Sequence, residues 1–170
     1  MVLKLWRTPT YNRGMSSPVN PPSGRPAATP HRVLALDVGS RTIGLAVSDP
    51  LGITAQGLET IRRKNKRADW EALGHVLHQY AVQEIVVGYP LRMSGSAGTQ
   101  AEKVSAFAEE LRGRFGLPVH LWDERLTSAQ ANRLLRETDM SIRRRASVVD
   151  RLAAVLILQG FLDHRSTSRT

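Results

Sequence analysis

Three carboxylates stand in the sequence at places where a charged side chain is costly. Asp37 follows a run of four apolar residues, and Glu124 follows the predicted strand 117–122. Asp150 lies in the first turn of the predicted helix 147–162, among valine, leucine and alanine. A lone carboxylate with apolar neighbours is destabilising unless it is paired or binds a cation. Carboxylates and water suit Mg²⁺ or Mn²⁺, and two such ions about 3.5–4 Å apart are a common device for hydrolysing phosphodiester bonds.

Each of these acids also has a purely structural interpretation. Asp150 could stabilise the N-terminus of its helix, where the helix dipole favours negative charge. Asp37 could accept hydrogen bonds from backbone amides of the turn near Gly39. Three acids at the carboxyl edges of neighbouring strands and on the covering helix favour a metal centre over three separate structural roles.

Several arginines lie near the acids in the sequence and are candidates for binding phosphate. Arg41 lies in the turn that follows Asp37. Arg125 directly follows Glu124, where it could bind a phosphate through two hydrogen bonds or form an ion pair with Asp123. Phosphate contacts supply much of the affinity for nucleic acids. The residues expected to bind nucleic acid are Arg41, Arg92 in the loop 88–98, Arg125, and the run Arg143, Arg144 and Arg145 that precedes the last predicted helix.

Two further groups carry less weight. A second basic run at 62–67 lies between a predicted strand and a predicted helix, farther from the acids in the sequence. His75 and His78 are three residues apart and have no third ligand nearby. A zinc site needs more ligands than this pair provides, so the two histidines indicate an exposed helix face.

Apolar runs, turns and helical spacing predict the elements that must position these groups. Three strands separated by turn residues come first, and alternating helices and strands follow, which together predict an α/β fold with a mixed five-stranded sheet flanked by helices. Thr99 could cap a helix with Glu102 completing a capping box. The predicted strands are 33–37, 43–47, 53–61, 84–87 and 117–122, and the predicted helices are 69–80, 99–111, 127–136 and 147–162.

Composition limits the classes of protein that the chain can belong to. Its 170 residues suit one domain, and the absence of cysteine excludes disulfides and cysteine-ligated metals. Lys and Arg number 24 against 15 Asp and Glu, a net charge of +9 that favours a polyanionic partner, chiefly nucleic acid. The longest apolar run, 152–158, is far shorter than the roughly 20 residues of a membrane span. We therefore expect a cytoplasmic protein that does not enter a membrane.

The first 31 residues differ from the rest of the chain. They contain four Lys and Arg, no acidic residue, and six prolines among serines and glycines, which predicts a disordered basic arm. An organelle transit segment, or a start of translation at Met15, would also fit this composition. The expected organisation is an arm at 1–31, a catalytic domain at 32–163 and a flexible tail at 164–170.

Four motifs resemble one family in order and spacing. They are VLALDVGSRTIGLAVSD (33–49), VGYPL (87–91), DERLTS (123–128) and VDRLAAVLILQ (149–159). Together they span nearly the whole chain beyond the arm, and they are similar to the YqgF family, also called RuvX, of Holliday junction resolvases. The resemblance implies a ribonuclease H-like fold, which agrees with the order of strands and helices expected from the residues.

The resemblance also implies an activity and the residues that carry it. Asp37, Glu124 and Asp150 would form a catalytic triad of acids that holds two Mg²⁺ or Mn²⁺ ions, with Asp37 as the bridging ligand. The implied enzyme is a metal-dependent nuclease that acts on a four-way DNA junction, on the 5′ end of precursor 16S rRNA, or on both. Symmetric cutting of a junction would require two active sites and hence a homodimer.

One segment departs from the family pattern, and one alternative function stays open. The loop after VGYPL usually carries an acid, but here it has Met93, Ser94 and Gly95, so no metal ligand is expected from this loop. The alternative is a non-catalytic nucleic-acid-binding protein on the same fold, for which the basic arm and the arginine runs would suffice. The three acids argue against it, because binding nucleic acid does not require buried negative charge.

Overall fold

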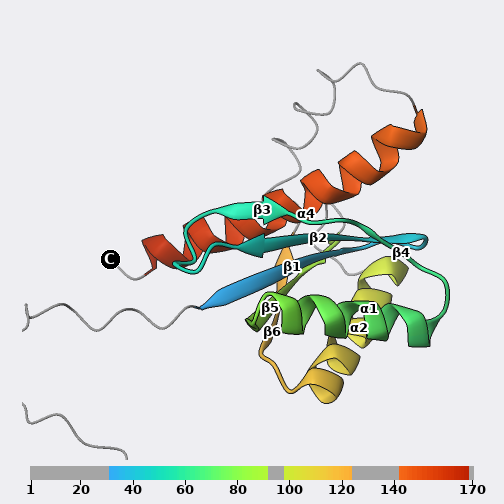
Figure 1. Cartoon of the computed structure of the whole chain (residues 1–170), viewed down its shortest axis with the longest axis horizontal. Coiled ribbons are helices and arrows are strands. Elements are labelled where there is room, and N and C mark those ends of the chain that lie inside the picture. The colour runs from blue at the N-terminus through green and yellow to red at the C-terminus, as the bar shows by residue number, and fades with distance from the viewer. Residues whose placement is uncertain (1–30, 92–97, 124–141, 169–170) are drawn as a thin grey trace, which may run out of the picture.

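The computed structural model describes residues 31–91, 98–123 and 142–168, and the side chains of the last segment from residue 149 onward. Figure 1 shows a twisted sheet with helices on both of its faces. In chain order the elements are β1 (Arg32–Val38), β2 (Thr42–Ser48), β3 (Ala55–Gly57), β4 (Ile61–Arg62), α1 (Lys66–Gln79), β5 (Val82–Tyr89), α2 (Thr99–Phe115), β6 (Val119–Asp123) and α4 (Ile142–Thr167).

The sheet is mixed, and its centre is the first strand. The order is β3-β2-β1-β5-β6, with β4 paired to the same strand β2 as β3. β1 pairs antiparallel with β2 and parallel with β5, and β5 pairs parallel with β6. Because β1, β5 and β6 run in the same direction, their carboxyl ends lie at one edge of the sheet. The predicted mixed α/β architecture is confirmed.

Alternation along β1 divides the core into two layers. Leu34, Leu36 and Val38 belong to a cluster that contains the buried faces of α1 and α2. Val33 and Ala35 belong to a second cluster with Ala154, Ile157, Leu158 and Leu162 of α4. Successive side chains of a strand point to opposite faces, so a central strand covered on both faces has to be apolar throughout. Asp37 has the same parity as Val33 and Ala35, and it therefore faces α4.

The predicted third strand is two short strands. β3 pairs with the end of β2, and β4 pairs with its beginning, while residues 58–60 leave the ladder. Leu58 and Ile61 both pack against the α1–α2 cluster although they are three residues apart. In a continuous strand, residues three positions apart point to opposite faces. The strand is therefore interrupted between Leu58 and Ile61.

Helix ends account for most of the other differences. α1 begins three residues before the predicted start, because the Asn65 side chain accepts a hydrogen bond from the backbone N–H of Ala68 at 2.9 Å. The predicted cap at Thr99 is wrong, since Gly98 precedes the helix and no side chain caps it. The predicted helix 99–111 is present as α2, and its buried residues are Ala101, Val104, Ala108 and Leu111, which share one helix face.

The last helix is longer than predicted at both ends. It begins at Ile142 rather than at residue 147, and it continues to Thr167, into the segment expected to be a flexible tail. Asp150 therefore lies in the third turn, and the run 143–145 lies inside the helix rather than before it. Within residues 149–162 only Arg151 is exposed, and the buried residues are Ala154, Ile157, Leu158 and Leu162. The predicted helix 127–136 and the arm up to residue 30 lie outside the described residues.

No helix among the described residues is long and apolar enough to cross a membrane.

Candidate active site

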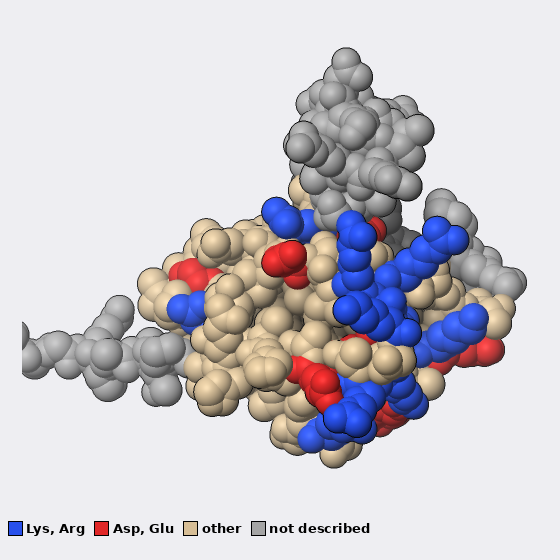
Figure 2. All heavy atoms as spheres, turned by 45° about the vertical axis from the view of Figure 1, so that its right-hand side comes forward, with Lys and Arg blue, Asp and Glu red and all other residues tan. Residues whose placement is uncertain are grey.

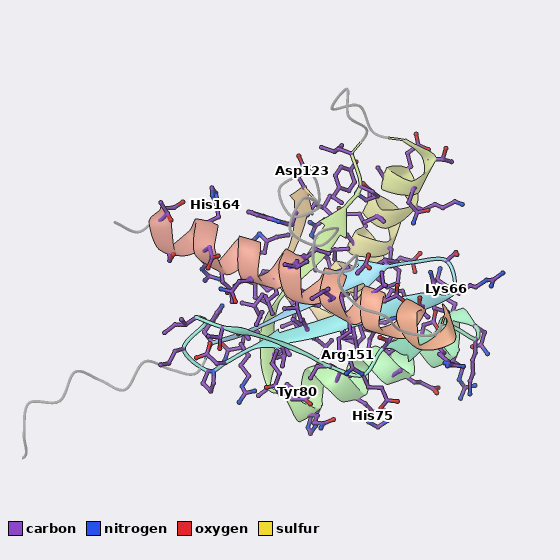
Figure 3. All side chains as sticks on the ribbon, turned by 90° about the horizontal axis from the view of Figure 1, so that it is seen from above. Lys66, His75, Tyr80, Asp123, Arg151 and His164 are labelled. Carbon is purple, nitrogen blue, oxygen red and sulfur yellow. The ribbon has the colours of Figure 1, made fainter. Side chains whose placement is uncertain are left out.

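Two of the three predicted acids come together where α4 crosses the sheet. Asp37 stands one residue from the end of β1, and Asp150 stands on the face of α4 that packs against β2. Figure 3 looks down on this helix as it crosses the strands, and Arg151, the neighbour of Asp150 in the chain, is labelled on it. The two carboxylates are close enough for the charge of Asp150 to shift the pKa of Asp37.

A glycine in β2 permits this approach. Gly44 is the register partner of Asp37, and a Cβ atom added to it would lie 2.2 Å from the backbone oxygen of Asp150. No side chain fits in that space, because real Cβ contacts are essentially never shorter than 3.0 Å. The helix backbone thus rests on the strand backbone, and the glycine sets how closely Asp150 approaches Asp37.

A threonine that the sequence analysis missed orients the second acid. The Thr42 hydroxyl donates a hydrogen bond of 2.7 Å to Oδ2 of Asp150. Thr42 has the same parity in β2 as Gly44, so it lies on the face of the sheet that α4 covers. The signal that could have identified it is this parity: one polar residue precedes the apolar strand, two positions before the glycine that faces the acid.

Burial and repulsion both act on Asp37. Burial, and secondarily the negative charge of Asp150, raise the pKa of the Asp37 carboxyl from 3.8 to about 6. Of the turn amides that could have bonded to Asp37, that of Gly39 is engaged elsewhere, because its N–H donates to the carbonyl oxygen of Thr42 at 2.9 Å. The helix-terminus interpretation of Asp150 is also wrong, since its helix begins eight residues earlier.

The acid pair fits a divalent cation in its chemistry. Two carboxylates held together at a cost gain stability when a cation lies between them, and oxygen ligands suit hard ions such as Mg²⁺ and Mn²⁺. Within the described side chains there is no group of three or more potential metal ligands. The third predicted acid, Glu124, lies outside the described residues. β6 ends at Asp123, one residue before it, at the same edge of the sheet as the end of β1.

The predicted phosphate-binding arginines are only partly described. Arg41 is exposed in the turn between β1 and β2, and its carbonyl oxygen accepts a hydrogen bond from the backbone N–H of Arg63 at 2.9 Å. Arg92 and Arg125 lie outside the described residues. The run Arg143, Arg144 and Arg145 occupies the first turn of α4, but its side chains are not described.

The histidine pair lies on α1, away from the acids, whereas the basic run 62–67 contacts the turn after Asp37. His75 and His78 are exposed on α1, which agrees with the predicted surface helix. α1 packs on the face of the sheet opposite to α4, so the pair cannot join the carboxylates. Arg63 donates to the carbonyl oxygen of Gly39 at 2.9 Å, so the basic run contacts the turn that follows Asp37, which its distance in the sequence did not indicate.

Comparisons with known proteins converge on one family. The model of the RuvX family, described as Holliday junction resolvase, matches residues 31–164. A protein of Koribacter versatilis named "Putative pre-16S rRNA nuclease" is 60% identical over 144 residues, which are 85% of this chain and 94% of that protein. A protein of the same name from Moorella thermoacetica is 58% identical over 132 residues, 78% of this chain and 94% of that protein.

A solved structure agrees on the fold. The yeast mitochondrial Holliday junction resolvase Ydc2 superposes with a TM-score of 0.51 at 11% identity, over 85% of this chain and 82% of that chain. At this identity the likeness concerns the fold alone. It confirms the ribonuclease H-like fold that the sequence motifs implied.

Proposed function

The chain belongs to the RuvX family, and from this premise we propose that it is a divalent-metal-dependent nuclease that acts on the precursor of 16S rRNA. The observation that carries the proposal is the pair of carboxylates, Asp37 and Asp150, which the fold holds together at the carboxyl edge of the sheet. Relatives at 60% and 58% identity over 94% of their length bear the name of a pre-16S rRNA nuclease, which favours this substrate. The family description favours a four-way DNA junction as the second candidate.

The catalytic and metal-binding residues of the proposal are Asp37, Glu124 and Asp150. Asp37 contributes from β1 and Asp150 from α4, where Thr42 fixes one carboxylate oxygen of Asp150 and leaves the other free to bind. Trp122, two residues before Glu124, packs against α4, which is the face that a third acid would have to share. When bound, Mg²⁺ or Mn²⁺ ions would activate the attacking water and stabilise the leaving oxygen.

The nucleic-acid-binding residues of the proposal are arginines that lie near the acids in the sequence. Arg41 is exposed in the turn directly after the first acid, where a guanidinium can hold the phosphate on either side of the cleaved bond. Arg92, Arg125 and the run Arg143, Arg144 and Arg145 complete the set. The basic arm at 1–31 adds sequence-independent attraction to a polyanion, and a cytoplasmic location follows from a precursor rRNA substrate.

A cleavage assay tests the proposal. The substrates are a labelled fragment of precursor 16S rRNA, a labelled four-way DNA junction and a matched DNA duplex, each with Mg²⁺ or with Mn²⁺. The wild type is expected to cut the RNA, and Asp150→Asn is expected to lose at least a hundredfold in rate while it still binds, because it loses a metal ligand but no phosphate-binding group. Asp163→Asn is the matched control, since it changes an exposed aspartate on the same helix.

The outcomes separate the candidates. Paired symmetric cuts in the junction, with the RNA left intact, would replace the RNA substrate by the junction and would call for a dimer. Tight binding of nucleic acid without cleavage by the wild type would refute the nuclease and support the non-catalytic alternative. Full activity of Asp150→Asn would refute the assignment of the acid pair.

A further inference from the structure

A basic pocket lies on the face of the sheet opposite to the acid pair. Its volume is about 640 Å³, and it is bounded by the turn after β1, the segment before α1, and α2. The turn contributes Gly39 and Ser40, which come two and three residues after Asp37. The pocket therefore begins at the same hairpin that carries the first catalytic acid, but around the edge of the sheet.

The charges that line the pocket are mostly positive. Arg63, Lys64, Lys66 and Lys103 all contribute to its wall. Lys64 and Lys103 are exposed, and their side chains form no ion pair with an acid among the described residues, although the backbone N–H of Lys64 donates to Oδ1 of Asp69 at 3.3 Å. Two lysines from separate segments that line one cavity, without an acid paired to either side chain, favour an anionic occupant.

The acids of the pocket are already engaged. Asp69 is buried, with 3% of its surface exposed, and its Oδ2 accepts a hydrogen bond of 2.9 Å from Nε of Arg63. Glu110 forms an ion pair of 2.9 Å with Lys66. Arg63 is thus fixed as part of the wall, and the charges left for an occupant are those of Lys64 and Lys103.

The aromatic rings of the pocket are also engaged, which indicates what the occupant is not. Trp70 stacks on Phe107 with ring centroids 4.8 Å apart, and the Arg63 guanidinium lies 5.9 Å from the centroid of Phe107. Trp70 is buried, with 5% of its surface exposed. Rings that pack on one another and on an arginine do not offer a free face to a base, so the pocket suits a backbone phosphate better than a stacked nucleobase.

The start of α1 adds to the attraction. Asn65 caps this helix and contacts the N–H of Ala68 through its side chain and the N–H of Asp69 through its backbone oxygen. The preceding N–H groups, those of Lys66 and Arg67, have no partner within the helix. The positive end of a helix of 14 residues therefore faces the same cavity as the two lysines.

Basic side chains lie between the pocket and the end of the sheet that carries Asp37 and Asp150. Arg41 is exposed in the turn between β1 and β2, and Arg62 is exposed in β4, where it pairs with Thr42 at the start of β2. The backbone N–H of Arg63 donates a hydrogen bond to the carbonyl oxygen of Arg41. Figure 2 shows Lys and Arg side chains gathered over one end of the molecule. A nucleic-acid strand that leaves the acids can cross this hairpin and stay in contact with positive charge.

We propose that the pocket formed by Lys64, Lys103 and the start of α1 binds a backbone phosphate of the nucleic-acid strand that lies across the acid pair. This subsite is independent of base sequence, and it rests on the proposed nuclease function. The nucleic-acid strand would then contact the enzyme at two places, the acid pair on the α4 face of the sheet and the pocket on the α1–α2 face. These two contacts together would position the scissile bond.

Equilibrium binding in the presence of a metal chelator tests the subsite without cleavage. The probe is the labelled precursor 16S rRNA fragment or the four-way junction, whichever the wild type binds more tightly, and the dissociation constant is measured by fluorescence anisotropy over a range of salt concentrations. The double variant Lys64→Ala/Lys103→Ala is expected to bind about tenfold more weakly near 0.15 M salt. The slope of log K against log salt should fall by about 2, one for each lost phosphate contact.

A matched variant separates contact from general charge. Arg67→Ala/Arg114→Ala removes the same two charges from exposed residues of α1 and α2 that do not line this pocket. We expect it to change the dissociation constant by about twofold or less. Equal effects of the two double variants would refute the subsite, as would a Lys64→Ala/Lys103→Ala variant that binds like the wild type.

The subsite and the proposed function can fail separately. If the wild type cuts its substrate and the lysine variant binds normally, the subsite is refuted and the nuclease stands. If the wild type binds neither probe, both are refuted.

Discussion

At the scale of single residues, the central feature is a carboxylate held where its negative charge is disfavoured. Asp37 lies in a strand covered on both faces, and Asp150 adds its charge from the helix above. Burial and the charge of Asp150 both make the ionised form of Asp37 unfavourable. A bound cation offsets this cost, so cation binding favours loss of the Asp37 proton. This explains in physical terms why the fold tolerates two acids so close together.

A titration of the metal-free protein tests this account. We expect the carboxyl carbon of Asp37 to titrate near pH 6 in a nuclear magnetic resonance experiment. In Asp150→Asn the pKa should fall but stay above 3.8, because burial is the larger cause and persists in the variant. Because the pKa of Asp37 is raised on folding, its contribution to the free energy of unfolding is lost as the pH rises from about 4 through 6.

The control for this titration is a distant acid on the same helix. Asp163→Asn should leave the pKa of Asp37 unchanged. A pKa of Asp37 that already lies near 3.8 in the wild type would contradict the account, and so would one that does not respond to Asp150→Asn.

At the scale of elements, the site depends on how closely α4 lies on β2. Ala35 and Ala46 are small residues of the sheet that belong to the same cluster as α4, and the Gly44 backbone contacts the helix backbone directly. Small side chains on the strand let the helix backbone come close, as they do wherever two backbones touch. The sheet thus fixes the height of Asp150 above Asp37.

The variant Gly44→Ala tests this contact between the backbones of β2 and α4. Its methyl group would lie 2.2 Å from the Asp150 carbonyl oxygen, so α4 has to move by about 1 Å, and a displacement of that size can cost about a hundredfold in rate. We expect the cleavage rate to fall by about that factor and the free energy of unfolding to fall by about 3 kcal/mol. Urea denaturation and the cleavage assay measure the two effects.

Gly113 provides the matched control. It lies on the exposed side of α2, where an added Cβ meets nothing within 4 Å. Gly113→Ala should stabilise the protein by about 0.5–1 kcal/mol, because alanine favours the helix, and should not change the cleavage rate. A Gly44→Ala variant with wild-type stability and activity would show that the helix does not rest on this strand.

These elements also show what the sequence could and could not predict. The long apolar runs at β1 and β2, and the stripe of α2, were predicted because periodicity reports burial directly. The start of α4 was not, because a helix turn rich in arginine has no apolar stripe, and the misplaced start put Asp150 at a helix terminus. The split of the third strand and the cap by Asn65 depend on contacts with other segments, to which a local pattern does not respond.

Some residues of the candidate site could likewise be predicted from the sequence, and others could not. Asp37 and Asp150 were identified because charge is conspicuous among apolar neighbours. Thr42 and Gly44 were missed, since a threonine at the start of a strand and a glycine within it have many ordinary roles. Their importance appears only when the register sets Gly44 opposite Asp37 and the helix is seen to cross at that point.

At the scale of the whole molecule, one buried carboxylate ties four segments together at the end of the sheet opposite to the active site. Glu84 of β5 is 7% exposed, and its Oε2 lies 2.8 Å from Nε2 of His31 in the segment before β1. Its Oε1 lies 2.7 Å from Nε2 of His120 in β6, and Arg165 of α4 donates to its Oε2. Glu84 thus joins the central sheet to the last helix, whose other half carries Asp150.

The pKa of Glu84 sets the sign of its effect on stability. Burial raises the pKa, but hydrogen bonds from His31 and Arg165, together with the charges of Arg165 and His120, outweigh burial and hold the pKa below 4.5. A carboxyl group with a depressed pKa stabilises the folded state above its unfolded pKa, and this contribution is lost as the pH falls through the folded value. We therefore expect the contribution of Glu84 to the stability of the wild type to be lost as the pH falls below about 4.5.

The variant Glu84→Gln should remove this contribution with little change in volume. At pH 7 it leaves Arg165 beside a neutral amide, so the free energy of unfolding should fall by about 3 kcal/mol, and the difference from the wild type should shrink as the pH falls below 4.5. Glu71→Gln is the matched control: its ion pair with Arg67 joins side chains that are 60% and 88% exposed, so it should cost less than about 0.5 kcal/mol. Urea denaturation between pH 7 and pH 3.5 measures both. A Glu84→Gln variant whose deficit is the same at every pH would show that lost packing, rather than the charge of Glu84, holds α4 to this end of the sheet.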